Sequence, residues 1–294
     1  MQNELMERAA ALLERLETLF VASAAEPDWA ASTAFRWRKQ NGRGYLKPVP
    51  HPHRMRLADL LGVDEQKKML VANTRQFVAG LPANNVLLTG ARGTGKSSLV
   101  KAVLNQFAAK GLRLIEVEKH DLGDLPDIVD LVYGRAERFI LYCDDLSFGA
   151  EEAGYQALKA ILDGSIASNS DNLLVYATSN RRHLMPEYMA ENAATRHLGD
   201  EVHPDEAVEE KISLSERFGL WLSFYPFTQE EYLAIADHWA AQLGAAATDE
   251  ALRQRAALQW SLARGARSGR VAWQFARDWA GRHPLKESTH VRKR

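Results

Sequence analysis

The stretch that decides the fold is Gly90-Ala91-Arg92-Gly93-Thr94-Gly95-Lys96-Ser97, which fits the pattern G-x-x-x-x-G-K-[ST] at every position. Its glycines allow successive backbone N–H groups to turn toward one anion, and Lys96 adds a charge aimed at the outer phosphates of a nucleotide. An apolar run at 86–89 precedes the motif and a helical pattern at 97–108 follows it, so the positive end of a helix points at the same place. We therefore expect residues 90–98, Ser98 included, to bind nucleotide phosphates. A glycine-rich turn without a ligand is the alternative.

Working outward, apolar runs alternate with helical patterns from Leu57 onward. The further runs that predict strands lie at 112–117, 139–143, 173–177 and 220–225, and the further helical patterns between them lie at 122–133 and 155–166. Continuous apolar runs are typical of strands buried on both faces, and intervening helices are typical crossovers of a parallel sheet. Residues 54–226 are thus predicted to form an α/β core around a parallel five-stranded sheet.

The segment before the core, residues 1–53, is predicted to be a helical arm and a linker. Apolar residues recur at helical spacing between Leu5 and Phe20, as in a helix that packs on this chain, on a neighbouring subunit or on a partner. Prolines and glycines interrupt residues 26–53. Within them, Phe35-Arg36-Trp37-Arg38-Lys39 alternates aromatic and basic residues. This pattern fits either a nucleic-acid strand bound by stacking or a strand-like arm that holds the first helix.

The segment after the core, residues 227–294, shows only helical patterns, at 229–243, 249–263 and 268–281. It contains 11 Lys and Arg residues against 7 acidic residues and ends in the basic tail Arg292-Lys293-Arg294. We expect a small α-helical lid domain with a basic tail. Residues 181–211 are long and polar, with an acidic second half, which is typical of a functional or mobile connection.

Composition excludes several classes of protein. With 294 residues, 46% hydrophobic and 26% charged residues and a net charge of −1, the chain has an ordinary globular composition without the overall basic charge of a dedicated nucleic-acid binder. The one cysteine, Cys143, excludes an intramolecular disulfide, and His51 and His53 lack further metal ligands nearby. The first twenty residues do not resemble a signal peptide, and no run of about 18 apolar residues predicts a membrane span. We expect a cytoplasmic protein without a membrane partner.

Polar residues that suit phosphate chemistry follow two of the predicted strands. Asp144 comes directly after the run at 139–143, where a carboxylate supplies a second Mg²⁺ ligand beside the hydroxyl of Ser97. Asp145 follows it and is expected to act as a catalytic base, or else to be an N-cap or turn residue. Asn180 ends the strand at 173–177 and either orients a water molecule or caps a turn. Cys143 is expected in the core.

The order and approximate spacing of these segments resemble the AAA+ ATPases. In that resemblance the segments are Walker A at Gly90 to Ser97, Walker B at Asp144 and Asp145, sensor 1 at Asn180, the arginine finger at Arg217 and sensor 2 at Arg270. The segment 57–64, with Leu61 and Gly62, resembles the one that packs on adenine. The resemblance covers about residues 54–282 and implies the cofactors ATP and Mg²⁺.

More narrowly, the chain is similar to a bacterial AAA+ family known only as a domain of unknown function. The shared segments include Phe35-Arg36-Trp37, the stretch 61–66, Asp144 to Phe148 and Ser215 to Leu220. Two features depart from most AAA+ proteins: Asp145 stands where a Glu is usual, and the stretch 120–124 lacks the aromatic of an unfoldase pore loop. The Asp-Asp pair and Thr178-Ser179-Asn180-Arg181 resemble the replication-initiator and helicase-loader branch.

These observations favour an ATPase that hydrolyses ATP to ADP and phosphate while it remodels or loads a macromolecule, either protein or DNA. The alternatives are an assembly switch with little turnover and a loader-type ATPase that handles nucleic acid. By resemblance, Arg217 reaches the nucleotide of the next subunit in a homo-oligomer, or else pairs with the acidic run 206–210. Arg270 either senses the γ-phosphate or caps a neighbouring helix.

Overall fold

The computed structural model describes residues 27–147, 153–164, 171–180, 214–245 and 249–283. The predicted amino-terminal helix, the acidic segment 181–211 and the basic tail lie outside these residues. No helix within the described ranges has the length and apolar character needed to cross a membrane.

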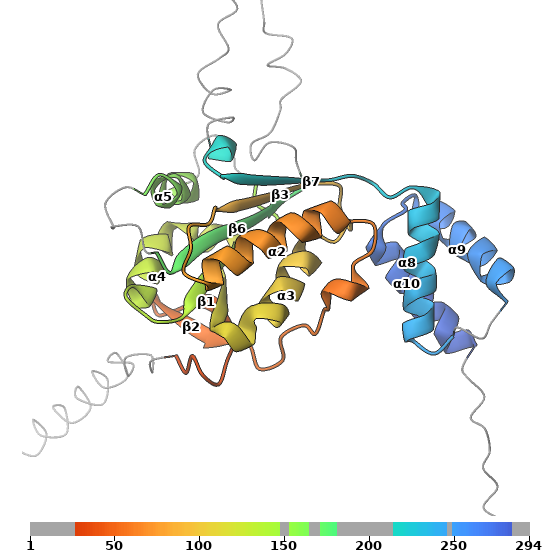
Figure 1. Ribbon diagram of the computed structural model, residues 1–294, viewed down its shortest axis with the longest axis horizontal. Helices are drawn as coiled ribbons and strands as arrows, with labels where there is room; N and C mark the ends of the chain where they lie inside the picture. The colour runs from red at the N-terminus through yellow and green to blue at the C-terminus, as the bar shows by residue number, and fades with distance from the viewer. Residues whose placement is uncertain (1–26, 148–152, 165–170, 181–213, 246–248, 284–294) are drawn as a thin grey trace, which may run out of the picture.

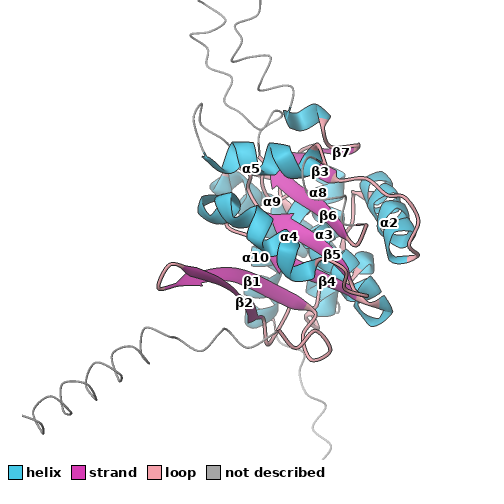
Figure 2. Cartoon of the chain, turned by 90° about the vertical axis from the view of Figure 1, so that its left-hand side faces the viewer, coloured by secondary structure: helices cyan, strands magenta, loops and turns pink. Residues whose placement is uncertain are grey.

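One twisted sheet forms the centre of the molecule, with the strand order β2-β1-β4-β5-β6-β3-β7 (Figures 1 and 2). Its strands are β1 (Ala34–Gln40), β2 (Arg43–Pro48), β3 (Val86–Gly90), β4 (Leu112–Glu116), β5 (Arg138–Cys143), β6 (Leu173–Ser179) and β7 (Leu220–Phe224). All neighbours are parallel except β1 and β2, which are antiparallel. Strand β6 lies between β3 and β5, so the ends of these three strands meet at one edge of the sheet.

The sheet has seven described strands rather than the predicted five, because residues 34–48 form a hairpin and not a linker. Asn41 and Gly42 both have positive φ, 52° and 74°, which suits a two-residue turn whose twist matches that of the strands. Phe35 and Trp37 are buried against the rest of the sheet, as the strand-like interpretation requires. The sequence did not predict these strands, because their charged residues and the prolines that flank them are typical of a linker.

Helices cover both faces of the sheet. On one face lie α2 (Asp64–Val78) and α3 (Lys96–Phe107), and on the other lie α4 (Leu125–Val132) and α5 (Ala153–Leu162). Short 3₁₀ helices add η1 (Leu57–Asp59), η2 (Ala108–Lys110) and η3 (Lys119–Asp124). The apolar side chains form one cluster on each face, and the cluster with α2 and α3 continues into the carboxy-terminal helices.

The carboxy-terminal helices are α8 (Gln229–Gln242), α9 (Glu250–Arg264) and α10 (Gly269–Arg282), each within two residues of its predicted bounds. Local signals fix their ends. Thr228 and Glu231 form a capping box at α8, while the side chains of Asp249 and Ser268 cap α9 and α10. The three helices pack beside the edge of the sheet where β3 ends (Figure 1).

Candidate nucleotide-binding site

The loop between β3 and α3 is held in a conformation that requires glycine. Gly90, Gly93 and Gly95 have φ values of 126°, 75° and 99°, in the region that L-residues with side chains rarely adopt. A Cβ atom on Gly90 would lie 1.9 Å from the carbonyl oxygen of Phe224. The loop therefore needs glycine both for its backbone turn and for its close approach to β7.

Lys96 lies at the base of this loop and is only 6% exposed. Its Nζ atom donates hydrogen bonds to the carbonyl oxygens of Gly90 at 2.7 Å and Ala91 at 2.8 Å, and to Oδ1 of Asn180 at 3.1 Å. Burial lowers the pKa of Lys96, and the nearby carboxylates of Asp144 and Asp145 oppose that shift. A partly desolvated cation held by weak acceptors is well prepared to bind a stronger anion.

Ser97, Asp144 and Thr178 form a cluster of oxygen atoms beside the loop. Oγ of Ser97 donates to Oδ1 of Asp144 at 2.7 Å, and Oγ1 of Thr178 donates to the same oxygen at 2.5 Å. Burial raises the pKa of Asp144, but the hydrogen bonds from Thr178 and Ser97 lower it by more, so the net pKa lies below its ordinary value. The carboxylate is thus held ionised.

A hydroxyl and a carboxylate are the oxygen ligands that Mg²⁺ accepts, alongside phosphate oxygens and water. Among the described residues, no group of three or more His, Cys, Asp and Glu side chains converges as a metal site. Ser97 and Asp144 therefore suit a Mg²⁺ ion shared with a nucleotide rather than an ion held by protein ligands alone.

Asp145 and Asn180 lie at the ends of β5 and β6, beside the phosphate loop. Asp145 has a φ of 52°, unusual for a residue with a side chain, and its N–H donates to Oγ1 of Thr178 at 2.9 Å. Nδ2 of Asn180 donates to Oδ1 of Asp145 at 2.5 Å, while Oδ1 of Asn180 accepts from Lys96. Asn180 thus connects the lysine of the loop to the second aspartate, so the residues predicted at two strand ends do meet.

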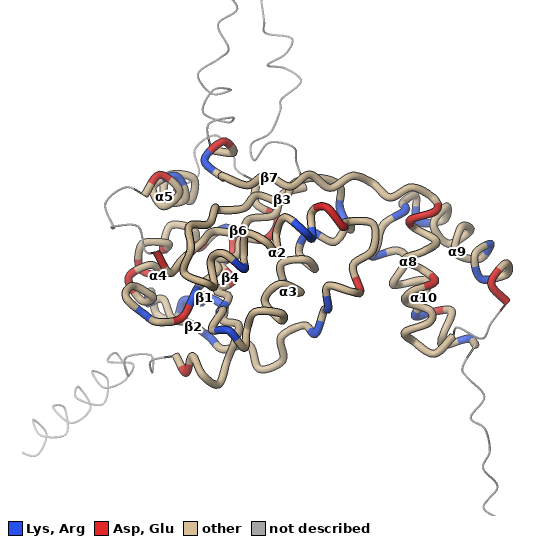
Figure 3. The backbone as a smooth tube through the Cα atoms, in the orientation of Figure 1, with Lys and Arg blue, Asp and Glu red and all other residues tan. Residues whose placement is uncertain are grey.

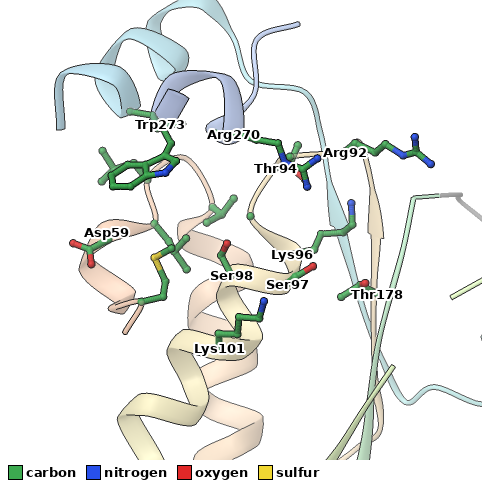
Figure 4. A pocket seen from close by; sticks show the side chains of 18 of the residues that line it. Asp59, Arg92, Thr94, Lys96, Ser97, Ser98, Lys101, Thr178, Arg270 and Trp273 are labelled. Carbon is green, nitrogen blue, oxygen red and sulfur yellow. The ribbon is translucent and has the colours of Figure 1, made fainter. Parts of the chain in front are cut away.

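The carboxy-terminal helices contact the loop directly. The N–H of Gly269, at the start of α10, donates to the carbonyl oxygen of Gly93 at 2.8 Å. A Cβ on Gly93 would come within 2.9 Å of Ser268, so the two segments touch. Arg270 extends from α10 over the loop beside Thr94 (Figure 4). Arg270 thus lines the cleft, and its role as a sensor of the γ-phosphate stays a prediction.

The cleft has a volume of about 910 Å³ and runs between the loop and these helices. Residues 92–98 line it together with Asp144, Asp145, Asn180 and Arg270, while Gly90 and Ala91 lie behind Lys96. Away from the loop the lining includes apolar side chains, Leu61 among them, together with Asp59. Gly62 does not line the cleft. It packs against the ring of Phe227 instead, with positive φ.

Two tryptophans in the lining of the cleft were not predicted as site residues. Trp239 on α8 and Trp273 on α10 line the cleft, with ring centroids 4.7 Å apart and an edge-on arrangement. Trp273 follows Arg270 by three positions, so both lie on one face of α10 (Figure 4). That spacing is the signal in the sequence that identifies Trp273. For Trp239 and for Thr178 no local signal exists.

Arg217 lies outside this cleft, just before β7. Its Nε atom forms an ion pair with Asp163 at the end of α5, and its side chain is half-buried. The acidic run 206–210, its alternative partner from the sequence, falls outside the described residues. The proposed position of Arg217 in the nucleotide site of a neighbouring subunit stays a prediction.

Comparison with known proteins identifies the family. Residues 30–283 match the family described as "Protein of unknown function (DUF815)". A stretch of 149 residues is 33% identical to the 26S proteasome regulatory subunit 4 homolog of Schizosaccharomyces pombe, covering 45% of this chain and 33% of that protein.

Among solved structures, two RuvB variants of Thermotoga maritima superpose with a TM-score of 0.53 each, at 18% and 19% identity. The superpositions cover 77% of this chain and 65% and 66% of the RuvB chains. The chain thus spans a third of the curated relative and about two thirds of the structural ones. Since the match to the family model covers most of the chain, the chain belongs to the family described as "Protein of unknown function (DUF815)", and its fold is similar to that of the RuvB structures.

Proposed function

We propose that this protein hydrolyses ATP to ADP and phosphate in a Mg²⁺-dependent reaction that remodels or loads a macromolecule. The observation that carries the proposal is the hydrogen bond between Ser97 and Asp144. It joins the first turn of α3 to the end of β5, at the base of a cleft that holds a buried lysine. In this arrangement a nucleotide's β- and γ-phosphates replace the carbonyl acceptors of Lys96.

Asp145 is the proposed catalytic base. Its carboxylate accepts a proton from the attacking water, and Asn180, hydrogen-bonded to it, fixes the carboxylate and the position of that water. Ser97 and Asp144 would hold Mg²⁺, which neutralises phosphate charge when bound. Since Asp145 is one carbon shorter than the usual Glu, turnover is expected to be slow relative to AAA+ proteins with Asp-Glu.

The lid helices complete the nucleotide site. Trp239 and Trp273, with Leu61, offer an apolar surface for the base, and Arg270 approaches the γ-phosphate from above the loop. Because Gly269 is hydrogen-bonded to Gly93, a change at the phosphates is transmitted to α10. We infer that the lid position reports the state of the nucleotide.

Steady-state phosphate release beside equilibrium ATP binding tests this function. Mg²⁺-dependent release that disappears with EDTA supports an ATPase. Tight ATP binding with assembly but without release would instead support the nucleotide-controlled switch.

Homo-oligomer formation is part of the proposal and rests on Arg217. This residue does not line the cleft of its own subunit, and we propose that it exchanges its ion pair with Asp163 for a neighbour's γ-phosphate. An arginine supplied in trans contributes about 10³–10⁵ in rate. Specific activity should therefore rise with protein concentration, and Arg217→Ala should remove most of the turnover at unchanged ATP affinity.

Mixing two inactive variants gives a sharper test. Arg217→Ala keeps an intact phosphate loop, and Lys96→Ala keeps an intact arginine, so mixed oligomers should regain part of the hydrolysis. A mixture that stays inactive, or a parent protein whose turnover per subunit does not depend on concentration, would show that Arg217 does not act in trans.

A further inference from the structure

The hairpin β1–β2 lies in the most basic stretch of the described chain. Between Asp28 and Asp59 there is no Asp or Glu, while seven residues are Lys or Arg: Arg36, Arg38, Lys39, Arg43, Lys47, Arg54 and Arg56. This local excess of positive charge is not visible in the net charge of the whole chain, which is −1. Figure 3 shows Lys and Arg distributed along the two strands.

The hairpin also projects beyond the sheet. Strand β1 pairs with β4 only over Ala34 to Arg36, whereas it pairs with β2 along its full length to Gln40. Residues 37–46 therefore form a two-stranded ribbon, which extends away from the body of the molecule in Figure 2. Strand β2 is the outermost described strand of the sheet, so one of its backbone edges is not paired within the described chain.

The two faces of this ribbon differ in chemistry. The register places Arg36 opposite Lys47, Arg38 opposite Tyr45 and Gln40 opposite Arg43, so one face carries four cations and a half-buried tyrosine. The other face carries Phe35, Trp37 and Leu46, which are buried. Trp37 is further fixed because its Nε1 donates to Asp124 at 2.8 Å.

Acidic neighbours neutralise the cations of β1 but not those of β2. Arg36 pairs with Glu116, Arg38 with Glu118 and Lys39 with Asp124. Arg43 and Lys47 are exposed, and neither has an ion-pair partner in the part of the chain that the structure describes. Lys47 lies directly across from Arg36, whose cation is already paired with Glu116.

We propose that the exposed face of this hairpin binds the phosphate backbone of duplex DNA through Arg43, next to the turn, and Lys47, opposite Arg36. A projecting two-stranded ribbon has the width that the major groove accepts, and cations on one face match its phosphates. Phe35 and Trp37, the aromatic residues that alternate with the cations of β1, are buried and do not offer their rings to single-stranded bases. The inference names the macromolecule of the proposed function, but binding does not depend on ATP hydrolysis.

Fluorescence anisotropy of a labelled DNA duplex with the full-length chain, without nucleotide, tests the inference. The double variant Arg43→Ala/Lys47→Ala should weaken binding and reduce the slope of log K against log salt by roughly 1.8, since each phosphate contact contributes about 0.9. The matched control is Lys68→Ala/Arg75→Ala, which removes two exposed cations from α2 and should leave affinity and slope unchanged. Neither variant touches the cleft, so both should keep the parent's ATP affinity.

Three results would overturn the inference: equal losses in the two double variants, tighter binding of a single strand than of the duplex, or equal competition by poly-glutamate. The last would identify an acidic polypeptide as the partner. Lys96→Ala should keep DNA binding in this assay, so failure of the ATPase proposal and failure of the DNA proposal remain distinguishable.

Discussion

The phosphate loop and the β1–β2 hairpin both present cations to phosphate, in opposite physical settings. Lys96 is 6% exposed and donates three hydrogen bonds to fixed acceptors at a cleft. Arg43 and Lys47 are exposed on a projecting edge strand, without an ion-pair partner among the described residues. The first setting is preorganised and partly desolvated, so it selects by geometry, whereas the second remains in water and responds to charge density.

This difference predicts how each region responds to change. Loss of one group in the cleft should have a large effect that salt hardly alters. Loss of one cation on the hairpin should have a small effect that salt screens.

Asp145→Asn should lower turnover by about 10²–10⁴-fold while ATP and Mg²⁺ binding persist, since an amide does not accept the proton. Single-turnover phosphate release measures the effect. The matched variant Asp144→Asn should instead weaken Mg²⁺-dependent ATP binding, because it removes the charge that faces Ser97. If both variants lose the same property, the division of roles between the two aspartates is wrong.

Lys96→Ala should weaken ATP binding roughly a hundredfold, which corresponds to about 3 kcal/mol for charge-assisted hydrogen bonds. The apo protein should keep its fold, because the variant also removes a buried cation whose pKa is lowered by desolvation. Calorimetric titration with ATP and thermal unfolding measure the two quantities. The hairpin variant Arg43→Ala/Lys47→Ala serves as the control and should keep its ATP affinity. An equal loss of ATP affinity in this variant would contradict the difference between the phosphate loop and the hairpin.

Gly44→Ala should destabilise the hairpin by about 1–3 kcal/mol, because overpacking forces a large ring to move. A Cβ atom at this position would lie 1.8 Å from the indole of Trp37. Denaturant unfolding gives the change in the free energy of unfolding. The control is Gly281→Ala near the end of α10, where a Cβ meets nothing within 4 Å, and this change should be neutral or stabilising.

The smallest effect concerns the pH dependence of stability at Asp124, which contacts Lys39 and Trp37 of β1. Burial raises the pKa of Asp124, but the hydrogen bonds from Lys39 and Trp37 and the charge of Lys39 together lower it by more, so its folded-state pKa lies below its ordinary value. The stability that this carboxylate contributes is present above the unfolded pKa and is lost as pH falls through the folded pKa. In thermal unfolding between pH 6 and roughly pH 2, Asp124→Asn should lose less stability than the parent. If stability falls equally with pH in the parent and in Asp124→Asn, the contacts of Asp124 contribute nothing to stability.

The sequence predicted the helix bounds of the lid and the core strands closely, because their apolar periodicity and caps are local signals. It missed the hairpin although Asn41-Gly42 is a strong turn signal, since charged residues alternate in both strands and prolines follow. It assigned aromatic stacking as one role of Phe35 and Trp37, and both side chains turned out to be buried in the sheet.

In the site, the sequence alone determined the glycine loop, Lys96, Ser97 and the two aspartates, because each belongs to a short contiguous pattern with one chemical purpose. Only the tertiary structure decided that Thr178 bonds to Asp144, that Asn180 connects Lys96 to Asp145, and that Trp239 faces Trp273. These contacts join residues 34 to 84 positions apart, and they depend on which strands become neighbours and in what register. Pairing of distant strands is set by the packing of the whole sheet and its helices, so no local stretch of sequence specifies it.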